Sequence, residues 1–327
     1  MRTKYLFLCA LWLAGFGLVK AQAIITTFAG TDATFTGDGQ SALNAALGLI
    51  TGIAVDANGN VYFNDPDNHV VFRVGSDGII HVIAGNGIGG YSGDGGPATD
   101  ASIGGDETSY DLQLNPPVLN GIAVDASGNV YITTGSLVRR IDTKGIITTY
   151  AGGGSSHPGN GGQATNAALG VLLGITVDAS GNIYFVDRSF SAIRKVTPNG
   201  IISTIAGSGT GVNGFSGDGG SAAAAQLNNP IAITCDNAGN LYVAEQGPPG
   251  RIRKITIATG VINTVAGGGT LVPGAGVPPL QVNISAVRAV AVDSAGDIYT
   301  FAPNIGFLIK FAANGDSSYL SSTVRNT

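Results

Sequence analysis

The sequence of 327 residues carries 21 acidic and 16 basic side chains, a formal net charge of −5. With 44% hydrophobic and only 11% charged residues, the chain is too apolar to be disordered and long enough to bury a large core. The acidic balance disfavours nucleic-acid partners, because affinity for phosphate backbones comes largely from Lys and Arg.

The chain begins with a segment typical of a secretory signal peptide. Two basic residues precede the apolar run Tyr5–Val19, and a small-residue cleavage site, Ala21-Gln22-Ala23, follows it. The run is short for a membrane span, which needs about 20 apolar residues. We therefore expect a signal peptide over residues 1–23 and a secreted protein, extracellular or periplasmic, with no membrane span.

The expected mature chain, residues 24–327, is more acidic than the whole. It keeps 13 basic and 21 acidic residues, a balance of −8, which strengthens the case against nucleic acid. Cys235 is its only cysteine, so no internal disulfide is expected and a buried, unreactive thiol is predicted. We expect a monomer.

The rest of the chain repeats one eleven-residue stretch, GIAVDANGNVY at Gly52, five times. The aspartates that the copies share are 53 to 69 residues apart, a period that indicates an array of one supersecondary unit. These residues are Asp56, Asp125, Asp178, Asp236 and Asp293. Two short β-branched or aromatic runs flank a turn of Asp, Asn and Gly, which predicts a tight hairpin. The D-x-N-x-N spacing of the first copy also suits calcium, but the other copies lack the middle Asn, so we favour the turn.

Two further strand-like runs follow each hairpin, for example VVFRV at Val70 and IIHVIAG at Ile79. Four short antiparallel strands per unit predict an all-β fold, a β-propeller of four-stranded blades. Five repeats are visible, so we expect five blades, or six with one incomplete. The first strand-like run, Ile25–Gly30, is expected to complete the last blade beside Phe307–Phe311; alternatively, Asn314–Val324 forms that outer strand.

Basic residues recur on the third strand-like run of each of the first four units. We expect them to be solvated stems at the outer edge, not a basic binding stripe. They are Arg73, Arg140, Lys195 and Lys254.

The stretch Gly52–Val74 resembles the NHL repeat, with Asn68-His69-Val70 in place of its Asn-His-Leu element. The loop pattern AGNGIGGYSGDGGPATDA, from Ala84 to Ala101, is similar to that of bacterial secreted NHL-repeat proteins and of teneurin NHL domains. The resemblance covers residues 24–327 and implies a single propeller domain. The Asn-His pair occurs only in the first unit, so a function tied to that pair is not implied.

Long loops join each fourth strand to the first strand of the next unit. Their alanine-rich pieces are expected to form one helical turn each, and their Gly-Asp-Gly elements could anchor the loop or contact a ligand; we favour anchoring. The aspartates are Asp38, Asp94 and Asp218. On the same face, three second strands end in an acid: Asp65, Asp187 and Glu245. These acids could hold a cation, a sugar or a basic peptide, or they could cap loops or face water.

No catalytic group is evident. The three histidines, His69, His81 and His157, do not recur in register, and a nucleophile–base pair is absent from the repeats. We expect a non-enzymatic module with no cofactor, calcium being a weak possibility, that binds a protein or glycan through the long-loop face. Because some relatives of the fold are lyases or hydrolases, the alternative is a metal-dependent enzyme with a site in the axial channel.

Overall fold

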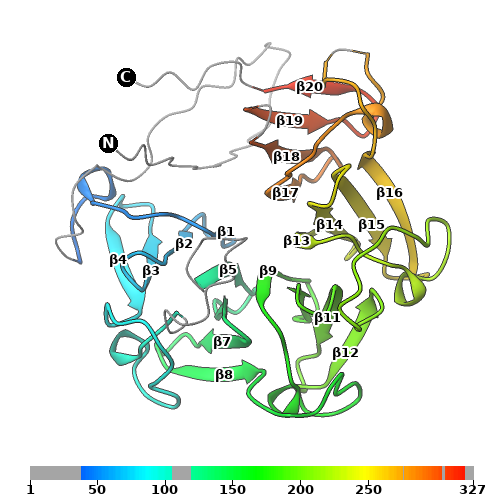
Figure 1. Cartoon of the computed structure of the whole chain (residues 1–327). Coiled ribbons are helices and arrows are strands. Elements are labelled where there is room, and N and C mark those ends of the chain that lie inside the picture. Colours follow the sequence, from blue (N-terminus) through cyan, green and yellow to red (C-terminus); the bar gives the residue numbers. More distant parts are fainter. Residues whose placement is uncertain (1–37, 105–118, 275, 304–305, 321–327) are drawn as a thin grey trace.

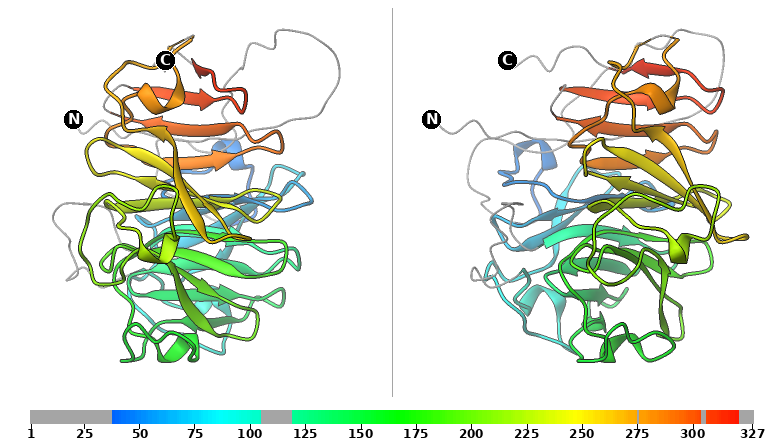
Figure 2. Two further views of the ribbon diagram at one scale, coloured as in Figure 1. Left: turned by 90° about the vertical axis from the view of Figure 1, so that its right-hand side faces the viewer. Right: turned by 45° about the vertical axis from the view of Figure 1, so that its right-hand side comes forward.

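Five four-stranded antiparallel sheets stand around a common axis and form a five-bladed β-propeller (Figure 1). The computed structural model describes residues 38–104, 119–274, 276–303 and 306–320. Viewed from the side, the sheets lie face against face (Figure 2). The prediction of an all-β propeller with four-stranded blades is confirmed.

Each blade runs from the axis to the rim in chain order. Blade 1 contains β1 (Ile53–Val55), β2 (Val61–Asp65), β3 (Val70–Val74) and β4 (Ile80–Ala84). Blade 2 contains β5 (Leu119–Val124), β6 (Val130–Thr134), β7 (Leu137–Ile141) and β8 (Ile147–Ala151). Blade 3 contains β9 (Leu172–Val177), β10 (Ile183–Asp187), β11 (Ala192–Val196) and β12 (Ile202–Ala206). Blade 4 contains β13 (Pro230–Cys235), β14 (Leu241–Glu245), β15 (Arg251–Thr256) and β16 (Val261–Gly267). Blade 5 contains β17 (Ala289–Val292), β18 (Ile298–Ala302), β19 (Phe307–Phe311) and β20 (Ser317–Tyr319).

The repeated aspartate closes the first hairpin of every blade. Oδ1 of Asp56 accepts the backbone N–H groups of Asn58 and Asn60 at 2.9 Å each. Its Oδ2 accepts the Asn60 amide at 2.7 Å and the Tyr62 hydroxyl at 3.1 Å. The other four blades repeat this set, except that blade 5 lacks the amide because Asp297 replaces the asparagine. The turn interpretation is confirmed, and these carboxylates are occupied within their own hairpins.

The basic residues beside these turns are held in place. Arg73 donates to the Asn60 side-chain oxygen at 3.0 Å, and Arg140 makes the same bond to Asn129 at 2.8 Å. The ammonium groups of Lys195 and Lys254 lie over tyrosine rings, 5.6 and 5.2 Å from the centroids. All four side chains are half-buried and lie over the hairpin, so they are more enclosed than the solvated stems that the sequence predicted.

The outer strand of blade 5 comes from the C-terminal part of the chain. β20 pairs antiparallel with β19, in a register that places Ser318 opposite Lys310. The prediction that Ile25–Gly30 fills this position was therefore wrong, and the alternative within Asn314–Val324 holds. Residues 25–30 and the predicted signal peptide, 1–23, lie outside the described residues. Within the described part, no helix is long and apolar enough to cross a membrane.

Candidate functional site: the inter-blade loops

Each long loop crosses the rim of the blade that it enters; we call these segments the inter-blade loops. They are residues 38–52, 85–118 (described to 104), 152–171, 207–229 and 268–288. In blade 3, Gln163 bridges to Ile201 next to the outer strand β12, and the Ala164 N–H donates to the Gly200 carbonyl at 2.7 Å. The first four loops thus add a short edge along the outer strand of their blade.

One turn of 3-10 helix follows in every loop; the alanine-rich pieces Ala42–Leu47, Ala164–Leu169 and Ala222–Leu227 predicted a helical turn in three of them. The turns are η1 (Ala42–Asn44), η2 (Ala98–Asp100), η3 (Ala164–Asn166), η4 (Ala222–Ala224) and η5 (Pro279–Gln281). In blade 3 the alanine that opens the turn, Ala164, and the one that follows it, Ala167, are fully buried. The methyl groups lie directly against the blade, and a larger side chain would push the loop away from it.

The acids at the ends of the second strands hold the ends of these loops. Asp65 Oδ2 accepts the Gly48 N–H at 2.7 Å, and Asp187 Oδ1 accepts that of Gly170 at 3.2 Å. Both acids and Glu245 are 0% exposed. They lie beneath their own loops, so the loop-capping alternative fits this geometry for Asp65 and Asp187, and none of the three faces water. Ligand contact by these three groups stays a prediction.

Burial dominates the titration of these acids. It raises the pKa of Asp187 to about 6, against the opposing effect of the Arg194 charge. It raises the pKa of Glu245 to about 7, against the nearby Arg253. Burial also raises the pKa of Asp65, although hydrogen bonds from Gly48 and Asn68 oppose the shift. Asp187 and Glu245 therefore change protonation near neutral pH.

Sequence reasoning missed three arginines at the centre of the third strands: Arg139, Arg194 and Arg253. Each is 0% exposed. Phe72 and Ile309 occupy the same position in blades 1 and 5 and are also buried, which is the signal that could have identified the position as inward-facing. A buried guanidinium requires acidic or carbonyl partners, and the loops supply them.

The loop aspartates are those partners in blades 2 and 4. Arg139 donates to Asp94 Oδ1 and Arg253 to Asp218 Oδ1, each at 2.7 Å. Arg253 also lies 3.4 Å from Glu245, so one guanidinium joins two of the predicted site acids. In blade 3 the loop position holds Asn160, 3.4 Å from Arg194. The favoured interpretation of these aspartates, that they anchor the loop, fits this geometry.

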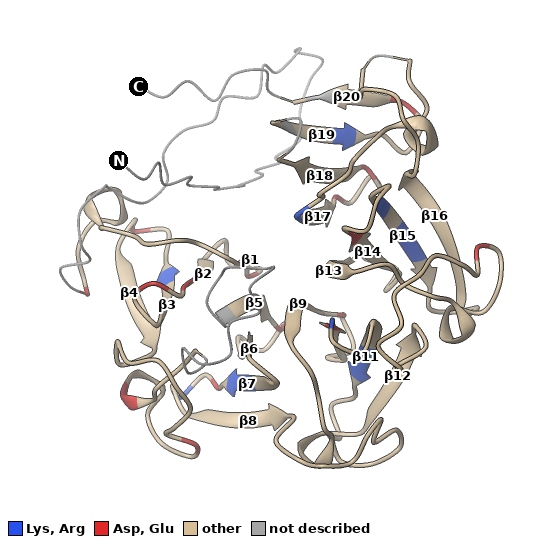
Figure 3. Cartoon of the chain, in the orientation of Figure 1, with Lys and Arg blue, Asp and Glu red and all other residues tan. Residues whose placement is uncertain are grey.

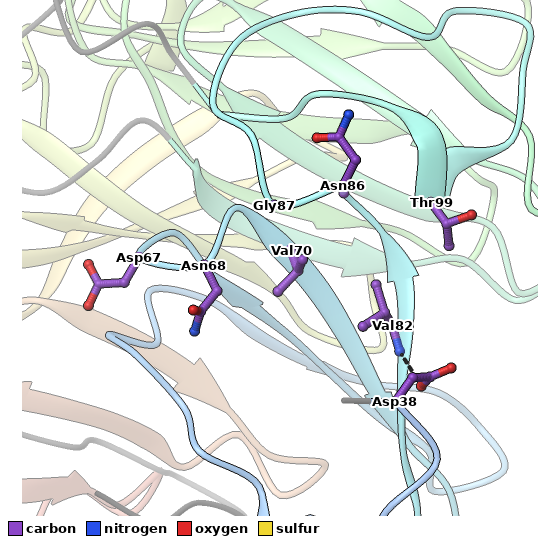
Figure 4. Close-up of a pocket in the computed structure, with 9 residues that line it drawn as sticks. Asp38, Asp67, Asn68, Val70, Val82, Asn86, Gly87 and Thr99 are labelled. Atoms are coloured by element: carbon purple, nitrogen blue, oxygen red, sulfur yellow. Dashed lines mark hydrogen bonds between the residues drawn. The ribbon is translucent and has the colours of Figure 1, made fainter. Parts of the chain in front are cut away.

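Asp38, the third loop aspartate, has no arginine partner of this kind, because blade 1 has Phe72 at the third-strand position where blades 2 and 4 have the arginine. Its Oδ1 accepts the Val82 N–H at 2.9 Å (Figure 4). The same oxygen lies 3.3 Å from Nδ1 of His81. The carboxylate lines a groove of about 560 Å³, with Asp67 and Asn68 at one end and Asn86 and Thr99 at the other (Figure 4).

A second groove, of about 380 Å³, occupies the corresponding place on blade 3. Asn160, Thr204 and Ala223 line it at the positions that Asp38, Val82 and Thr99 hold in blade 1. The ring of His157 borders this groove and lies 3.9 Å, between centroids, from Phe190. The rim groove is thus a repeated feature, whose lining changes from acidic in blade 1 to neutral in blade 3.

Exposed apolar side chains concentrate on the inter-blade loops. Nine of the ten large apolar side chains that are exposed in the described residues lie there, and the tenth, Val55, lies on β1. The nine are Leu43, Leu49, Ile88, Tyr91, Val212, Phe215, Leu271, Val272 and Leu280. Phe215 also stacks on Arg251, 3.8 Å from ring centroid to guanidinium, and Tyr91 on Arg139 at 4.6 Å. These side chains are distributed over four of the five loops, and exposed apolar groups on long loops are candidates for contact with a partner.

The charged groups follow the repeat. Most Lys and Arg lie on the third strands β3, β7, β11, β15 and β19, and the acids lie mainly in turns, loops and strand ends (Figure 3). Across the described part of the chain, no three His, Cys, Asp or Glu side chains gather as a metal-binding group.

Comparison with known proteins connects the chain to the teneurins. A model of the teneurin NHL domain matches residues 151–214. Mouse teneurin-1 is 30% identical over 248 residues, which make up 69% of this chain but only 8% of teneurin-1. The chain therefore spans less than a tenth of the length of this relative.

Two solved structures are similar in fold alone. A chain of the nidogen/laminin complex matches with a TM-score of 0.55 at 15% identity, over 84% of this chain and 82% of that one. A catalytically inactive histidine-to-alanine variant of virginiamycin B lyase from Staphylococcus aureus, with quinupristin, matches with a TM-score of 0.51 at 16% identity, over 86% and 73%.

Proposed function

We propose that this chain, an NHL-repeat β-propeller related to the teneurin NHL domain, is a secreted module that binds a protein partner on its inter-blade loops. One observation carries the proposal: nine of the ten exposed large apolar side chains in the described residues lie on these loops. Surfaces of this kind, with aromatic and arginine side chains among them, are typical of protein interfaces.

The anchoring of the loops supports a binding role. Buried arginines join the Asp94 and Asp218 loops to the blades, and the aromatic rings of Tyr91 and Phe215 stack on guanidinium groups. A surface held in this way loses little conformational entropy when a partner binds, which favours affinity.

The test compares matched variants of exposed apolar residues. Purified protein would be crosslinked to the surface and extracellular fraction of the producing cells. The triple variant Ile88→Ser, Val212→Ser, Val272→Ser removes three apolar groups that are more than half exposed, one from each of three loops. Val55→Ser, a residue 57% exposed on β1, is the control.

We expect one defined partner that the unaltered protein and Val55→Ser capture equally, and that the triple variant binds at least ~10-fold more weakly, a loss of ~1.4 kcal/mol. Equal capture of the partner by all three proteins would refute the proposal that the partner binds to the inter-blade loops. Displacement of the partner by soluble glycans alone would show a carbohydrate ligand instead. Secretion is tested separately by the N-terminus of the exported protein, expected near Ile24.

The competing prediction is a metal-dependent lyase or hydrolase at the axial channel. The similarity to virginiamycin B lyase, at 16% identity, concerns the fold alone and does not support an enzymatic function for this chain. Turnover that depends on an added metal and survives the triple loop variant would favour the enzyme.

A further inference from the structure

Arg139 is a buried cation whose hydrogen bonding is incomplete. Its Nη2 donates to the Ser92 carbonyl at 2.9 Å and to Asp94 at 2.7 Å. Its Nε and Nη1 are buried and have no partner among the described residues. A buried charged donor without an acceptor is strongly unfavourable, so this position calls for an additional group.

Blades 3 and 4 place a carboxylate at this position. Asp187 forms an ion pair with Nη1 of Arg194 at 3.8 Å, and Glu245 lies 3.4 Å from Nη1 of Arg253. Within the described part of the chain, Nε of both arginines, and Nη1 of Arg194, are also without a hydrogen-bond partner, so what distinguishes blade 2 is the missing carboxylate charge beside Nη1. In blade 2 the second strand ends instead in Thr134, which is buried and uncharged.

Threonine cannot perform both tasks of the carboxylate, anchoring the loop and facing the arginine, because its side chain has too few oxygen atoms. Asp187 has two: Oδ1 accepts the Gly170 N–H at the loop end, and Oδ2 faces Arg194. Thr134 has a single side-chain oxygen, and this atom accepts the corresponding N–H, that of Gly104, at 3.2 Å. The loop is therefore anchored in both blades, but Thr134 has no second oxygen that could face the arginine.

We propose that a small monovalent anion, the size of a halide or formate, binds beside Nε and Nη1 of Arg139 in blade 2. It occupies the place of the second carboxylate oxygen of Asp187 and Glu245. The charges then match blade 4, where Arg253 lies between the two carboxylates of Asp218 and Glu245. Guanidinium groups bind anions through charge-assisted hydrogen bonds from adjacent N–H groups. This inference does not depend on the proposed function.

Bromide offers a direct crystallographic test. Crystals soaked in bromide should show an anomalous peak beside Nη1 of Arg139, with no counterpart at Arg194 or Arg253, whose carboxylates exclude it. An ordered water without anomalous signal at Arg139, or equal peaks at all three arginines, would overturn the proposal.

Thermal unfolding in solution provides a second, independent readout. Bromide in tenfold excess over its dissociation constant should raise Tm by roughly 3 °C relative to gluconate, a larger anion, at equal ionic strength. Thr134→Glu, which rebuilds the carboxylate of blade 4, should abolish this shift. Thr134→Ser keeps the oxygen that anchors Gly104 and should retain it.

A halide effect of the same size in Thr134→Glu would refute the site. The acids that follow Gly104 in the sequence, Asp106 and Glu107, lie outside the described residues and provide a further control. If Asp106→Asn with Glu107→Gln destabilises the protein while the unaltered protein is insensitive to halide, the chain supplies its own counter-ion and the proposal fails.

Discussion

Blades 1 and 4 share one backbone plan but fill its central third-strand position in opposite ways. In blade 1 this residue is Phe72, whose ring lies 5.4 Å from that of Phe63. In blade 4 it is Arg253, which joins Glu245 in the core to Asp218 on the loop. Either residue fills the space, but only the arginine connects the loop to the core. The rim of blade 1 accordingly keeps an open acidic groove, in which Asp38 has no arginine partner.

The largest effect is expected from Arg253→Met. The substitution leaves Glu245 buried without its cation, so we expect the free energy of unfolding at pH 8 to fall by about 3–5 kcal/mol. Urea unfolding followed by tyrosine fluorescence measures the change. The double variant with Glu245→Leu removes both charges and should recover most of the loss.

Phe72→Met is the matched control in blade 1. It exchanges one buried apolar side chain for another, so the expected cost is about 1.5 kcal/mol. If Arg253→Met costs no more than this, the two blades do not differ energetically in the way their contacts indicate.

The pH dependence of stability is the next largest effect. The folded pKa of Glu245, about 7, exceeds the usual 4.5, so the native state holds this proton more tightly than the unfolded chain. Protonated Glu245 makes its full contribution to the free energy of unfolding below pH 4.5. This contribution, up to about 3 kcal/mol, is lost as the pH rises through 7. Glu245→Gln should flatten this part of the profile. A profile that is the same in both proteins would contradict the assignment to Glu245.

Replacing the loop aspartates Asp218 and Asp38 by asparagine should lower the free energy of unfolding by different amounts. Asp218→Asn weakens a charged hydrogen bond to buried Arg253 and should cost about 2 kcal/mol. Asp38→Asn keeps an oxygen for the Val82 N–H and loses only a half-exposed contact with His81, so about 0.5 kcal/mol is expected. Limited proteolysis should likewise cut the blade 4 loop faster in Asp218→Asn, and Asp38→Asn should leave that rate unchanged.

The smallest effects are expected at the hairpin covers, where the blades agree. Lys254 lies 3.9 Å from Asp236 in blade 4, and Arg73 contacts Asn60 in blade 1. Both are partly exposed, so Lys254→Met and Arg73→Met should each change the free energy of unfolding by about 0.5 kcal/mol or less. A large difference between the two would show that the blades also diverge on this face.

The fold followed from the sequence because its signals are local and repeated. The aspartate of each hairpin accepts N–H groups two and four residues further on, so the turn is encoded within a few positions. Five copies of that turn, each followed by strand-like runs, predicted the four-stranded blades but left their number at five, or six with one incomplete. The closing strand of blade 5 was harder to predict, because two segments had similar strand character and only pairing with β19 decides between them.

The sequence by itself thus determined the propeller, the hairpin turns and the 3-10 turns of the loops, all of which rest on contacts between near neighbours. Tertiary structure alone decided the state of the charged groups. Asp65 is buried by a loop 17 residues away, and Arg139 meets an aspartate 45 residues away. Whether a carboxylate faces solvent or anchors a loop depends on such distant partners. For that reason the sequence left open whether the acids that end the second strands contact a ligand, cap loops or face water, and only the folded chain shows Asp65 and Asp187 as anchors beneath the loops.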